Sequence, residues 1–208
     1  MSGLIPTTGV VLAGGKSSRM GGAKEGLDFG GVSLLEYVVD RVAGVFGRVA
    51  VVARDAAELP RIEADVFRDC ERGSGPLAGI CGGLRALETP YAFVCACDMP
   101  LVSGEVVRLL WEHAGEGDVV IPRWEKGIEP LHAFYSRACL EPVQRALSAG
   151  KRRIVDFFHE VRVVEVGAEE LSRVENYQES FVNLNTPGEY QQAVELMKRP
   201  GGRARRKG

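Results

Sequence analysis

A glycine-rich segment near the start of the chain, residues 9–24, constrains the fold more than any other. It reads G-V-V-L-A-G-G-K-S-S-R-M-G-G-A-K. Its consecutive apolar residues predict a short buried strand, and the glycines that follow let the backbone approach a ligand closely. Three basic residues, Lys16, Arg19 and Lys24, occur with no acidic residue between them. A strand, a basic glycine-rich loop and a following helix together favour a site for phosphate groups.

Three interpretations of this segment compete. The first is an ordinary strand-to-helix loop with surface lysines, which the glycine pair alone would explain. A Walker A loop is suggested by the G-K-S tripeptide at 15–17, but that pattern requires a glycine where Val10 stands. The third is a nucleotidyltransferase loop, which needs glycines, Arg19 and Lys24 at fixed offsets. On this last interpretation, L-A-G-G-K-S-S-R-M-G-G-A-K closely resembles the L-A-G-G-x-S-x-R-M-G-x-x-K loop of the molybdenum cofactor guanylyltransferases.

Length and charge limit the class of protein. The 208 residues, 45% of them hydrophobic, fit one globular domain with a substantial core. Lys and Arg number 26 against 28 Asp and Glu, a net charge of -2 that gives no support for a nucleic-acid partner. No apolar run approaches the roughly 20 residues of a membrane span, and residues 1–8 lack the apolar core of a secretory signal. We therefore expect a cytoplasmic protein with neither nucleic acid nor membrane among its partners.

Cysteine usage and the carboxyl terminus give two further expectations. The 5 cysteines are odd in number and include no C-x-x-C pair, so neither a disulfide scaffold nor a structural zinc site is expected. Cys95 and Cys97 alternate along an apolar run and should face the same side of a strand. We expect one nucleotidyltransferase domain over residues 1–198, and a basic, disordered tail over residues 199–208.

The alternation of apolar runs with helical patterns predicts a mostly parallel, doubly wound (Rossmann-like) α/β sheet flanked by helices. A strand that returns antiparallel is expected in the second half, at residues 131–135. Ser33 and Ser103 are expected to cap helices, Gly47 to end the first helix, and residues 186–189 to form a capping box. Further strands are expected at 10–12, 49–53, 66–67, 91–97, 119–121, 161–166 and 180–185, and helices at 33–46, 77–87, 103–113, 137–148 and from 187 to about 197.

Two aspartates follow predicted strands and should lie at the carboxyl edge of the sheet, where open α/β sheets bind ligands. Asp98 comes directly after the buried run 91–97, and a carboxylate there can hold Mg²⁺ against phosphates. Asp69 follows the strand at 66–67, and a carboxylate can accept both the N1–H and the 2-amino hydrogens of guanine. A helix cap or turn is the alternative for Asp98, and an ordinary surface aspartate is the alternative for Asp69.

The resemblance to the guanylyltransferases extends well beyond the first loop. D-M-P-L at 98–101 matches the family's D-x-P-x segment, G-P-L-A-G at 75–79 follows Asp69 as in the family, and E-P-L-H-A at 129–133 and N-L-N-T-P at 183–187 also match. The resemblance implies a nucleotidyltransferase (GT-A-like) fold. One departure lies at 52–54, which reads V-A-R where some members have an asparagine that touches the nucleotide. The resemblance implies GTP contacts at Leu12, Ala13, Gly14, Gly15, Lys24, Asp69 and Asp98.

The same resemblance implies the reaction. The family transfers GMP from GTP to the terminal phosphate of molybdopterin and releases pyrophosphate. Asp98 would bind Mg²⁺, and Lys24 and Arg19 would add positive charge at the α-phosphate. Molybdopterin contacts are less defined: Asn183 and Asn185 are expected near the cleft or as braces of the last helix. Surface cations that could meet the anionic pterin, or be merely solvated, are Arg123, Lys126, Arg152 and Arg153.

Alternative functions remain open on the sequence. A molybdopterin cytidylyltransferase usually has L-A-A-G where residues 12–15 read L-A-G-G. A sugar-phosphate nucleotidyltransferase would share the loop but lack the E-P-L-H-A and N-x-N-T-P segments. A non-catalytic nucleotide sensor would not need both Lys24 and Asp98. We expect a monomer, with transient contacts to molybdenum-insertion proteins as a further expectation.

Overall fold

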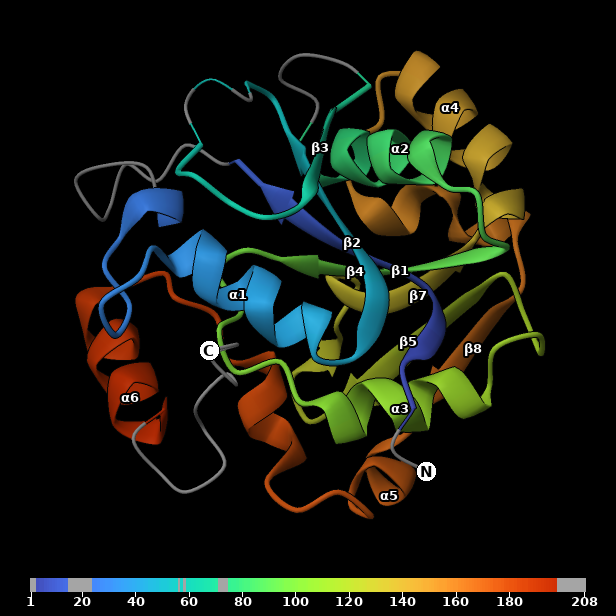
Figure 1. Ribbon diagram of the computed structural model, residues 1–208. Helices are drawn as coiled ribbons and strands as arrows, with labels where there is room; N and C mark the ends of the chain where they lie inside the picture. The colour runs from blue at the N-terminus through green and yellow to red at the C-terminus, as the bar shows by residue number, and fades with distance from the viewer. Residues whose placement is uncertain (1–2, 15–23, 56, 58, 71–74, 198–208) are drawn as a thin grey trace.

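The computed structural model describes residues 3–14, 24–55, 57, 59–70 and 75–197. Within them, one eight-stranded sheet has the order β3-β2-β1-β4-β7-β5-β6, with β8 paired to β5 (Figure 1). β1 pairs in parallel with β2 and β4, and β2 with β3, whereas β7 runs antiparallel between β4 and β5. The strands are β1 (Ile5–Ala13), β2 (Phe46–Ala53), β3 (Asp65–Arg68), β4 (Tyr91–Ala96), β5 (Val119–Trp124), β6 (Gly127–Ile128), β7 (His132–Ser136) and β8 (Val163–Val166).

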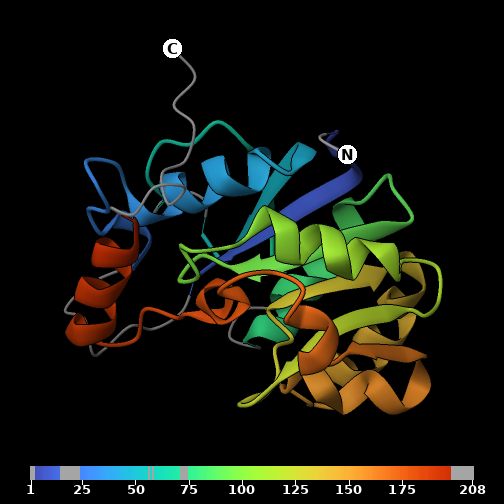
Figure 2. The ribbon, with the colours of Figure 1, turned by 90° about the horizontal axis from the view of Figure 1, so that it is seen from below.

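Helices cover both faces of the sheet, which is the expected doubly wound arrangement. Figure 1 shows α2 (Pro76–Ala86) and α4 (Leu140–Ser148) above the sheet. Figure 2, seen from below, shows the elements on the other face: α1 (Leu34–Ala43), α3 (Gly104–Glu112), α5 (Ala168–Leu171) and α6 (Pro187–Met197). Short 3-10 helices complete the chain at η1 (Lys24–Gly26), η3 (Arg137–Cys139), η4 (Ile154–Glu160) and η5 (Tyr177–Phe181).

The alternation of side chains along β1 explains why a core forms on each face. Val10 and Leu12 belong to the cluster under α2 and α4, and Val11 and Ala13 belong to the cluster under α1 and α3. Successive residues of a strand point to opposite faces, so a wholly apolar run is what a sheet covered on both sides requires. The predicted strand at residues 10–12 is therefore confirmed, and it is longer than the run that predicted it.

The helix caps largely follow the sequence. Ser33 Oγ accepts the Glu36 N–H (3.2 Å), and Ser103 Oγ accepts that of Val106 (3.4 Å). Thr186 Oγ1 accepts the Glu189 N–H (3.3 Å), as the predicted capping box requires. Ser, Thr and Asp side chains satisfy backbone donors that a helix leaves without intrahelical partners. The short polar residues that the sequence predicted as caps therefore do begin these helices.

One expected boundary and one expected strand are wrong. The first helix ends at Ala43 with Gly44 as its C-cap, and Gly47 lies inside β2 because Phe46 begins that strand and stacks on Phe93, with ring centroids 5.5 Å apart. The predicted strand at 180–185 is the end of η5 followed by irregular chain. This segment joins the rest of the protein through single hydrogen bonds, so no ladder forms.

The cysteines give one confirmation and one correction. Cys95 and Cys97 are both buried in the same core cluster, as their alternation predicts. Cys70 and Cys81 form a disulfide, which the sequence analysis did not predict. Their pairing depends on β3 and α2 lying side by side, and no local pattern shows that.

Among the described residues, none of the helices combines the length and apolar character needed to cross a bilayer. The predicted tail at 199–208 lies outside the described residues.

Candidate functional site

The carboxyl ends of the parallel strands meet at one edge of the sheet, where three of the predicted site residues form a row. Continuing the ladders between β1, β2, β3 and β4 past their last pairs aligns Gly14, Asp69 and Asp98. Two hydrogen bonds extend the ladders in this way: Asp69 N–H donates to Ala53 O (3.2 Å), and Cys97 N–H donates to Leu12 O (3.0 Å). Neighbouring strands lie about 4.8 Å apart, so three spacings place Asp69 and Asp98 on the order of 14 Å from each other.

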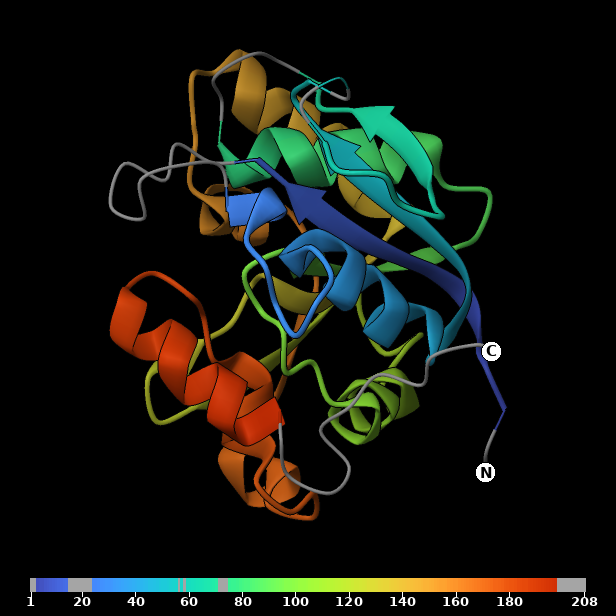
Figure 3. The same ribbon diagram turned by 60° about the vertical axis from the view of Figure 1, so that its left-hand side comes forward.

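The predicted phosphate loop leaves β1 at this edge. Leu12 and Ala13 are the last buried residues of the strand, and Gly14 follows with φ 123°, a conformation that favours glycine. Lys24 begins η1, which lies beside the carboxyl end of β1 in Figures 1 and 3. Gly15, Arg19 and the side chain of Lys24 lie outside the described residues. The backbone on both sides of the loop therefore lies at the edge that carries Asp98.

The loop that carries Asp98, residues 97–103, is held at several points. Asp98 is half-buried, and its carbonyl oxygen accepts the N–H of Leu184 (2.9 Å). Arg41 on α1 donates from Nε and Nη2 to Val102 O (3.0 and 2.9 Å). A carboxylate on a loop fastened at both ends is fixed before a ligand arrives, which is what a metal or phosphate site requires.

Asp69 lies at the far end of the row and is held by α2. The residue is half-buried, and the next amide, Cys70 N–H, donates to Ala78 O (3.2 Å). A side chain at Gly82 would place its Cβ 2.6 Å from Arg68 O and 3.1 Å from Asp69 Cα. Glycine at this position lets the helix approach the end of β3 closely. The disulfide between Cys70 and Cys81 adds a covalent tie between α2 and the residue that follows Asp69.

The asparagines of the N-L-N-T-P segment, Asn183 and Asn185, lie beside the Asp98 loop. They flank Leu184, the residue whose N–H donates to Asp98 O. Asn183 Nδ2 donates to Phe181 O (3.2 Å), and the backbone N–H of Asn185 donates to Glu189 Oε2 (2.8 Å) at the start of α6. The bond from Asn185 ties the chain to the first turn of α6 through its backbone, so it does not decide between a cleft role and a bracing role for the two amide side chains.

The cations considered for the pterin do not gather at one point. Arg123 Nη2 donates to Glu165 Oε1 (2.6 Å), and Lys126 Nζ lies over the Trp124 ring, 5.1 Å from its centroid. The backbone of Arg152 passes 4.0 Å from the Cβ position of Gly75, at the start of α2. Of these residues, Arg152 is therefore the one whose backbone lies beside Gly75, at the start of α2.

A second carboxylate lies opposite Asp98, and the sequence analysis gave it no role of its own. The antiparallel ladder pairs Cys95 with His132, and continuing it places Glu129 opposite Asp98. Burial raises the pKa of Glu129, and the nearby charge of Asp98 raises it further. The antiparallel direction expected for residues 131–135, combined with the ladder register, is the signal that could have identified this neighbour.

The donor set at this edge fits Mg²⁺ shared with a substrate. No three His, Cys, Asp or Glu side chains gather into a metal cluster among the described residues. Mg²⁺ is commonly bound through one or two carboxylates together with substrate phosphates, and it keeps several waters. A row with a carboxylate at Asp98 and the start of the predicted phosphate loop at Gly14 has this character, whereas an all-protein cage would need more ligands.

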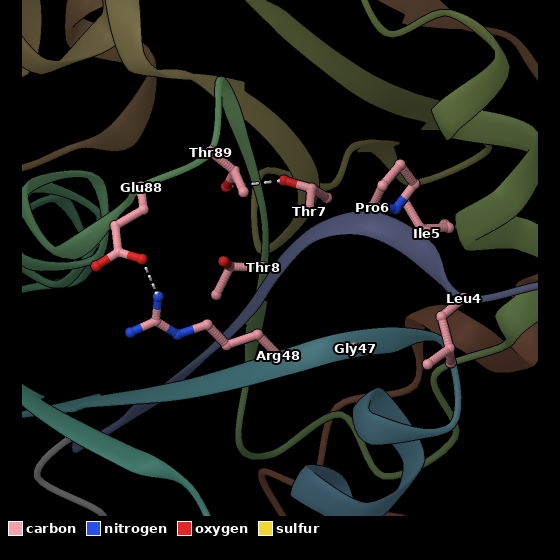
Figure 4. Close-up of a pocket in the computed structure, with 9 residues that line it drawn as sticks. All are labelled: Leu4, Ile5, Pro6, Thr7, Thr8, Gly47, Arg48, Glu88 and Thr89. Carbon is pink, nitrogen blue, oxygen red and sulfur yellow. Dashed lines mark hydrogen bonds and ion pairs between the residues drawn. The ribbon is translucent and has the colours of Figure 1, made fainter.

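A different hollow lies at the opposite edge, at the amino ends of β1 and β2 (Figure 4). Its polar groups already have protein partners: Arg48 Nη1 lies 2.8 Å from Glu88 Oε2, and Thr7 Oγ1 donates to Thr89 Oγ1 (3.1 Å). The exposed side chain of Leu4 covers one side of it. Open α/β sheets bind ligands at their carboxyl edge, so the row of Gly14, Asp69 and Asp98 is the candidate site.

Comparison with known proteins agrees with this geometry. The family model described as the MobA-like NTP transferase domain matches residues 9–166. A protein named molybdenum cofactor guanylyltransferase from Desulfosudis oleivorans is 33% identical over 193 residues, which cover 92% of this chain and 96% of that protein. A relative named probable molybdenum cofactor guanylyltransferase, from Pelotomaculum thermopropionicum, is 34% identical over 89% of this chain and 91% of its own length.

A solved structure gives the same result at the level of the fold. The crystal structure of molybdopterin-guanine dinucleotide biosynthesis protein A from Archaeoglobus fulgidus superposes with a TM-score of 0.80 and 30% identity. The match covers 91% of this chain and 97% of that chain. The family that the first loop resembled is thus the one found across the whole domain. The chain belongs to the MobA-like NTP transferase family, and it is a nucleotidyltransferase.

Proposed function

We propose that this enzyme transfers GMP from GTP to the terminal phosphate of molybdopterin and forms molybdopterin guanine dinucleotide. A phosphate oxygen of molybdopterin would form a bond to the α-phosphorus of GTP, and the bond to the β-phosphate would break, so that pyrophosphate leaves. The observation that carries the proposal is the row at the carboxyl edge, in which Gly14, where the predicted phosphate loop begins, lies between Asp69 and Asp98. The names of the relatives support the same nucleotide and acceptor.

In this proposal Asp69 binds the base. Its carboxylate can accept two hydrogen bonds from the N1–H and the 2-amino group of guanine, a pair of donors that adenine and cytosine do not present together. Charge-assisted hydrogen bonds of this kind are stronger than neutral ones. The distance between Asp69 and Asp98, about 14 Å, leaves room for the base, ribose and phosphates of one nucleotide to lie along the row.

The phosphates would lie between the first loop and Asp98. Residues 12–15, with Lys24 and Arg19, would contact them, and Asp98 would hold Mg²⁺. When bound there, Mg²⁺ would neutralise charge on the phosphates. The acceptor is already an anion at neutral pH, so no general base is required. Catalysis then consists of positioning and charge neutralisation by fixed groups. Asn183 and Asn185 would face the cleft from the pterin side.

Product identification tests this proposal. The protein is incubated with GTP, molybdopterin and Mg²⁺, and mass spectrometry is used to look for the dinucleotide, with one pyrophosphate released for each. We expect Asp98→Ala to lower kcat on the order of a hundredfold, the usual effect of removing one group that stabilises developing charge. Asp65→Asn is the matched control, because Asp65 begins β3 at the opposite edge and pairs with Arg48. A wild-type enzyme that binds GTP but forms no dinucleotide would contradict the proposal.

Two other functions have distinguishable outcomes. A cytidylyltransferase of the same fold would use CTP in this assay, and Asp69 would then have no guanine to bind. A nucleotide sensor would bind GTP and release no pyrophosphate. We further propose that the protein is a cytoplasmic monomer that meets molybdenum-insertion proteins transiently. Sedimentation of the purified protein, alone and with such a protein, measures the oligomeric state and the contact, and fractionation of cells measures the location.

A further inference from the structure

A chain of buried polar groups lies behind the candidate site and joins three elements. His132 on β7 is fully buried, and its Nε2 lies 3.3 Å from Ser180 Oγ in η5. The same Ser180 oxygen accepts the backbone N–H of Ser103 (2.9 Å). Ser103 is the N-cap of α3. One hydroxyl, itself only 1% exposed, therefore links the middle of the sheet, the start of α3 and the chain that leads to the last helix.

The surroundings of His132 indicate a role beyond packing. Burial lowers the pKa of His132 to about 3, so the ring is neutral at ordinary pH. The ring meets Phe93 and Phe181 edge-on, with centroids 5.0 Å away in each case. Its Nδ1 has no hydrogen-bond partner among the described residues. A buried site that needs only apolar volume is filled at lower free energy by an apolar side chain, which makes the contact with Ser180 the distinguishing property of the imidazole.

The same short segment holds both ends of the Asp98 loop. At the beginning of the loop, Leu184 N–H donates to Asp98 O (2.9 Å). At its end, the Ser103 N–H donates to Ser180 Oγ. Residues 180–184 thus fix the loop at two points, and His132 orients the hydroxyl that makes the second contact. Loss of that hydroxyl would leave the loop attached to this segment through the Leu184 bond.

We propose that Ser180 and His132 are positioning residues, which hold the Asp98 loop against residues 180–184 and so fix the Asp98 carboxylate relative to bound phosphates. The inference rests on the proposed function, in which Asp98 acts at the α-phosphate. Neither residue contacts substrate. Their effect is to preorganise a group that does, and a displacement of about 1 Å in such a group can cost up to a hundredfold in rate.

Three variants separate positioning from stability. Ser180→Ala removes the shared acceptor and leaves His132 without its partner. His132→Leu with Ser180→Ala replaces both polar groups by apolar ones, a change that is often nearly neutral for stability. Ser103→Ala is the control, since it removes the side-chain cap of α3 but keeps the backbone N–H that binds Ser180.

We expect Ser180→Ala to lower kcat between roughly tenfold and a hundredfold, with KM for GTP within about twofold of wild type. The double variant should recover stability but keep the low kcat. Amide hydrogen exchange at Leu184, measured without any ligand, should be faster in both and unchanged in Ser103→Ala. A purely structural role predicts instead that kcat returns with stability.

The inference is overturned if the double variant has wild-type kcat, or if Ser180→Ala leaves the exchange of Leu184 unchanged. These failures differ from a failure of the proposed function. A fully active Asp98→Ala would remove Asp98 from the reaction, whereas an active Ser180→Ala beside an inactive Asp98→Ala would remove only the positioning role.

Discussion

Asp69 is the single residue on which the choice of base depends in this account. The end of its strand is held by a hydrogen bond to β2 and by the close approach of α2 at Gly82. The carboxylate is therefore presented on a rigid backbone, a condition for selecting between bases. A site built to bind two donors rejects a ligand that lacks them, because its own polar atoms are then left unpaired.

Replacing Asp69 tests this role directly. We expect Asp69→Ala to weaken GTP binding roughly tenfold or more, the loss of about 1.5–3 kcal/mol that a hydrogen bond to a charged group represents. Inorganic triphosphate, which has no base, should bind as it does to wild type. Calorimetric titration of both ligands gives the comparison. Equal losses for GTP and triphosphate would remove Asp69 from base recognition and assign its effect to the phosphates or to the fold.

At the scale of elements, α2 and the end of β3 form one unit. The disulfide between Cys70 and Cys81 closes a short loop, with a sequence separation of 11 residues. In the chain-entropy model such a crosslink stabilises the folded state by about 3 kcal/mol, since it restricts the unfolded chain. The expected result is that a reductant lowers the free energy of unfolding of the wild-type protein by about this amount.

Urea unfolding measures the disulfide effect, and a variant supplies the control. Cys70→Ser with Cys81→Ser should unfold at the same urea concentration with and without reductant. The three other cysteines are free and buried, so they give the reductant no second bond to break. A wild-type protein whose unfolding is insensitive to reductant would show that the crosslink contributes nothing to stability.

Comparison of elements also shows what the sequence could predict. The strand after Gly9, the capped helices at Ser33 and Ser103, and the antiparallel return near Leu131 were predictable because each rests on a local period or cap. The segment at 180–185 was mispredicted as a strand, since its apolar residues pack against distant elements, as Phe181 does against Trp124 and His132. Its actual conformation depends on partners distant in the chain, which a local pattern does not contain.

The site divides in the same way. Gly14 and Asp98 were predictable because motifs place them directly after strands. The opposition of Glu129 to Asp98, and the bond between Ser180 and His132, depend on the register of β4 against β7 and on the packing of η5. Registers are set by the whole sheet, so these neighbours became visible only in the folded protein.

At the scale of the whole molecule, the ion pairs that join distant elements set a dependence of stability on pH. His113 at the end of α3 lies 3.0 Å from Glu170 on α5 and 3.3 Å from Glu116. The hydrogen bond with Glu170 raises the pKa of His113, and Glu116 adds to this. A histidine with a raised pKa in the folded state contributes stability that is fully present below its unfolded value of about 6.5 and is lost as the pH rises through the folded pKa.

The expected outcome is a loss of stability above pH 6.5 that depends on Glu170. Thermal unfolding from about pH 5.5 to about pH 8.5 should show the midpoint falling over the pH range in which His113 loses its proton. Glu170→Gln should flatten that part of the curve. Glu169→Gln is the matched control, because Glu169 is exposed on the same helix. An identical slope in wild type and Glu170→Gln would exclude this ion pair as the cause.

In the proposed enzyme, one edge of the sheet would hold the base at Asp69, the phosphates at Gly14 and Mg²⁺ at Asp98. The most direct test supplies the four nucleoside triphosphates one at a time, with Mg²⁺ and with or without molybdopterin, and measures the release of pyrophosphate. We expect release from GTP that requires both molybdopterin and Mg²⁺, with far less from ATP, CTP or UTP. Equal release from CTP and GTP, or release from GTP that does not depend on molybdopterin, would contradict it.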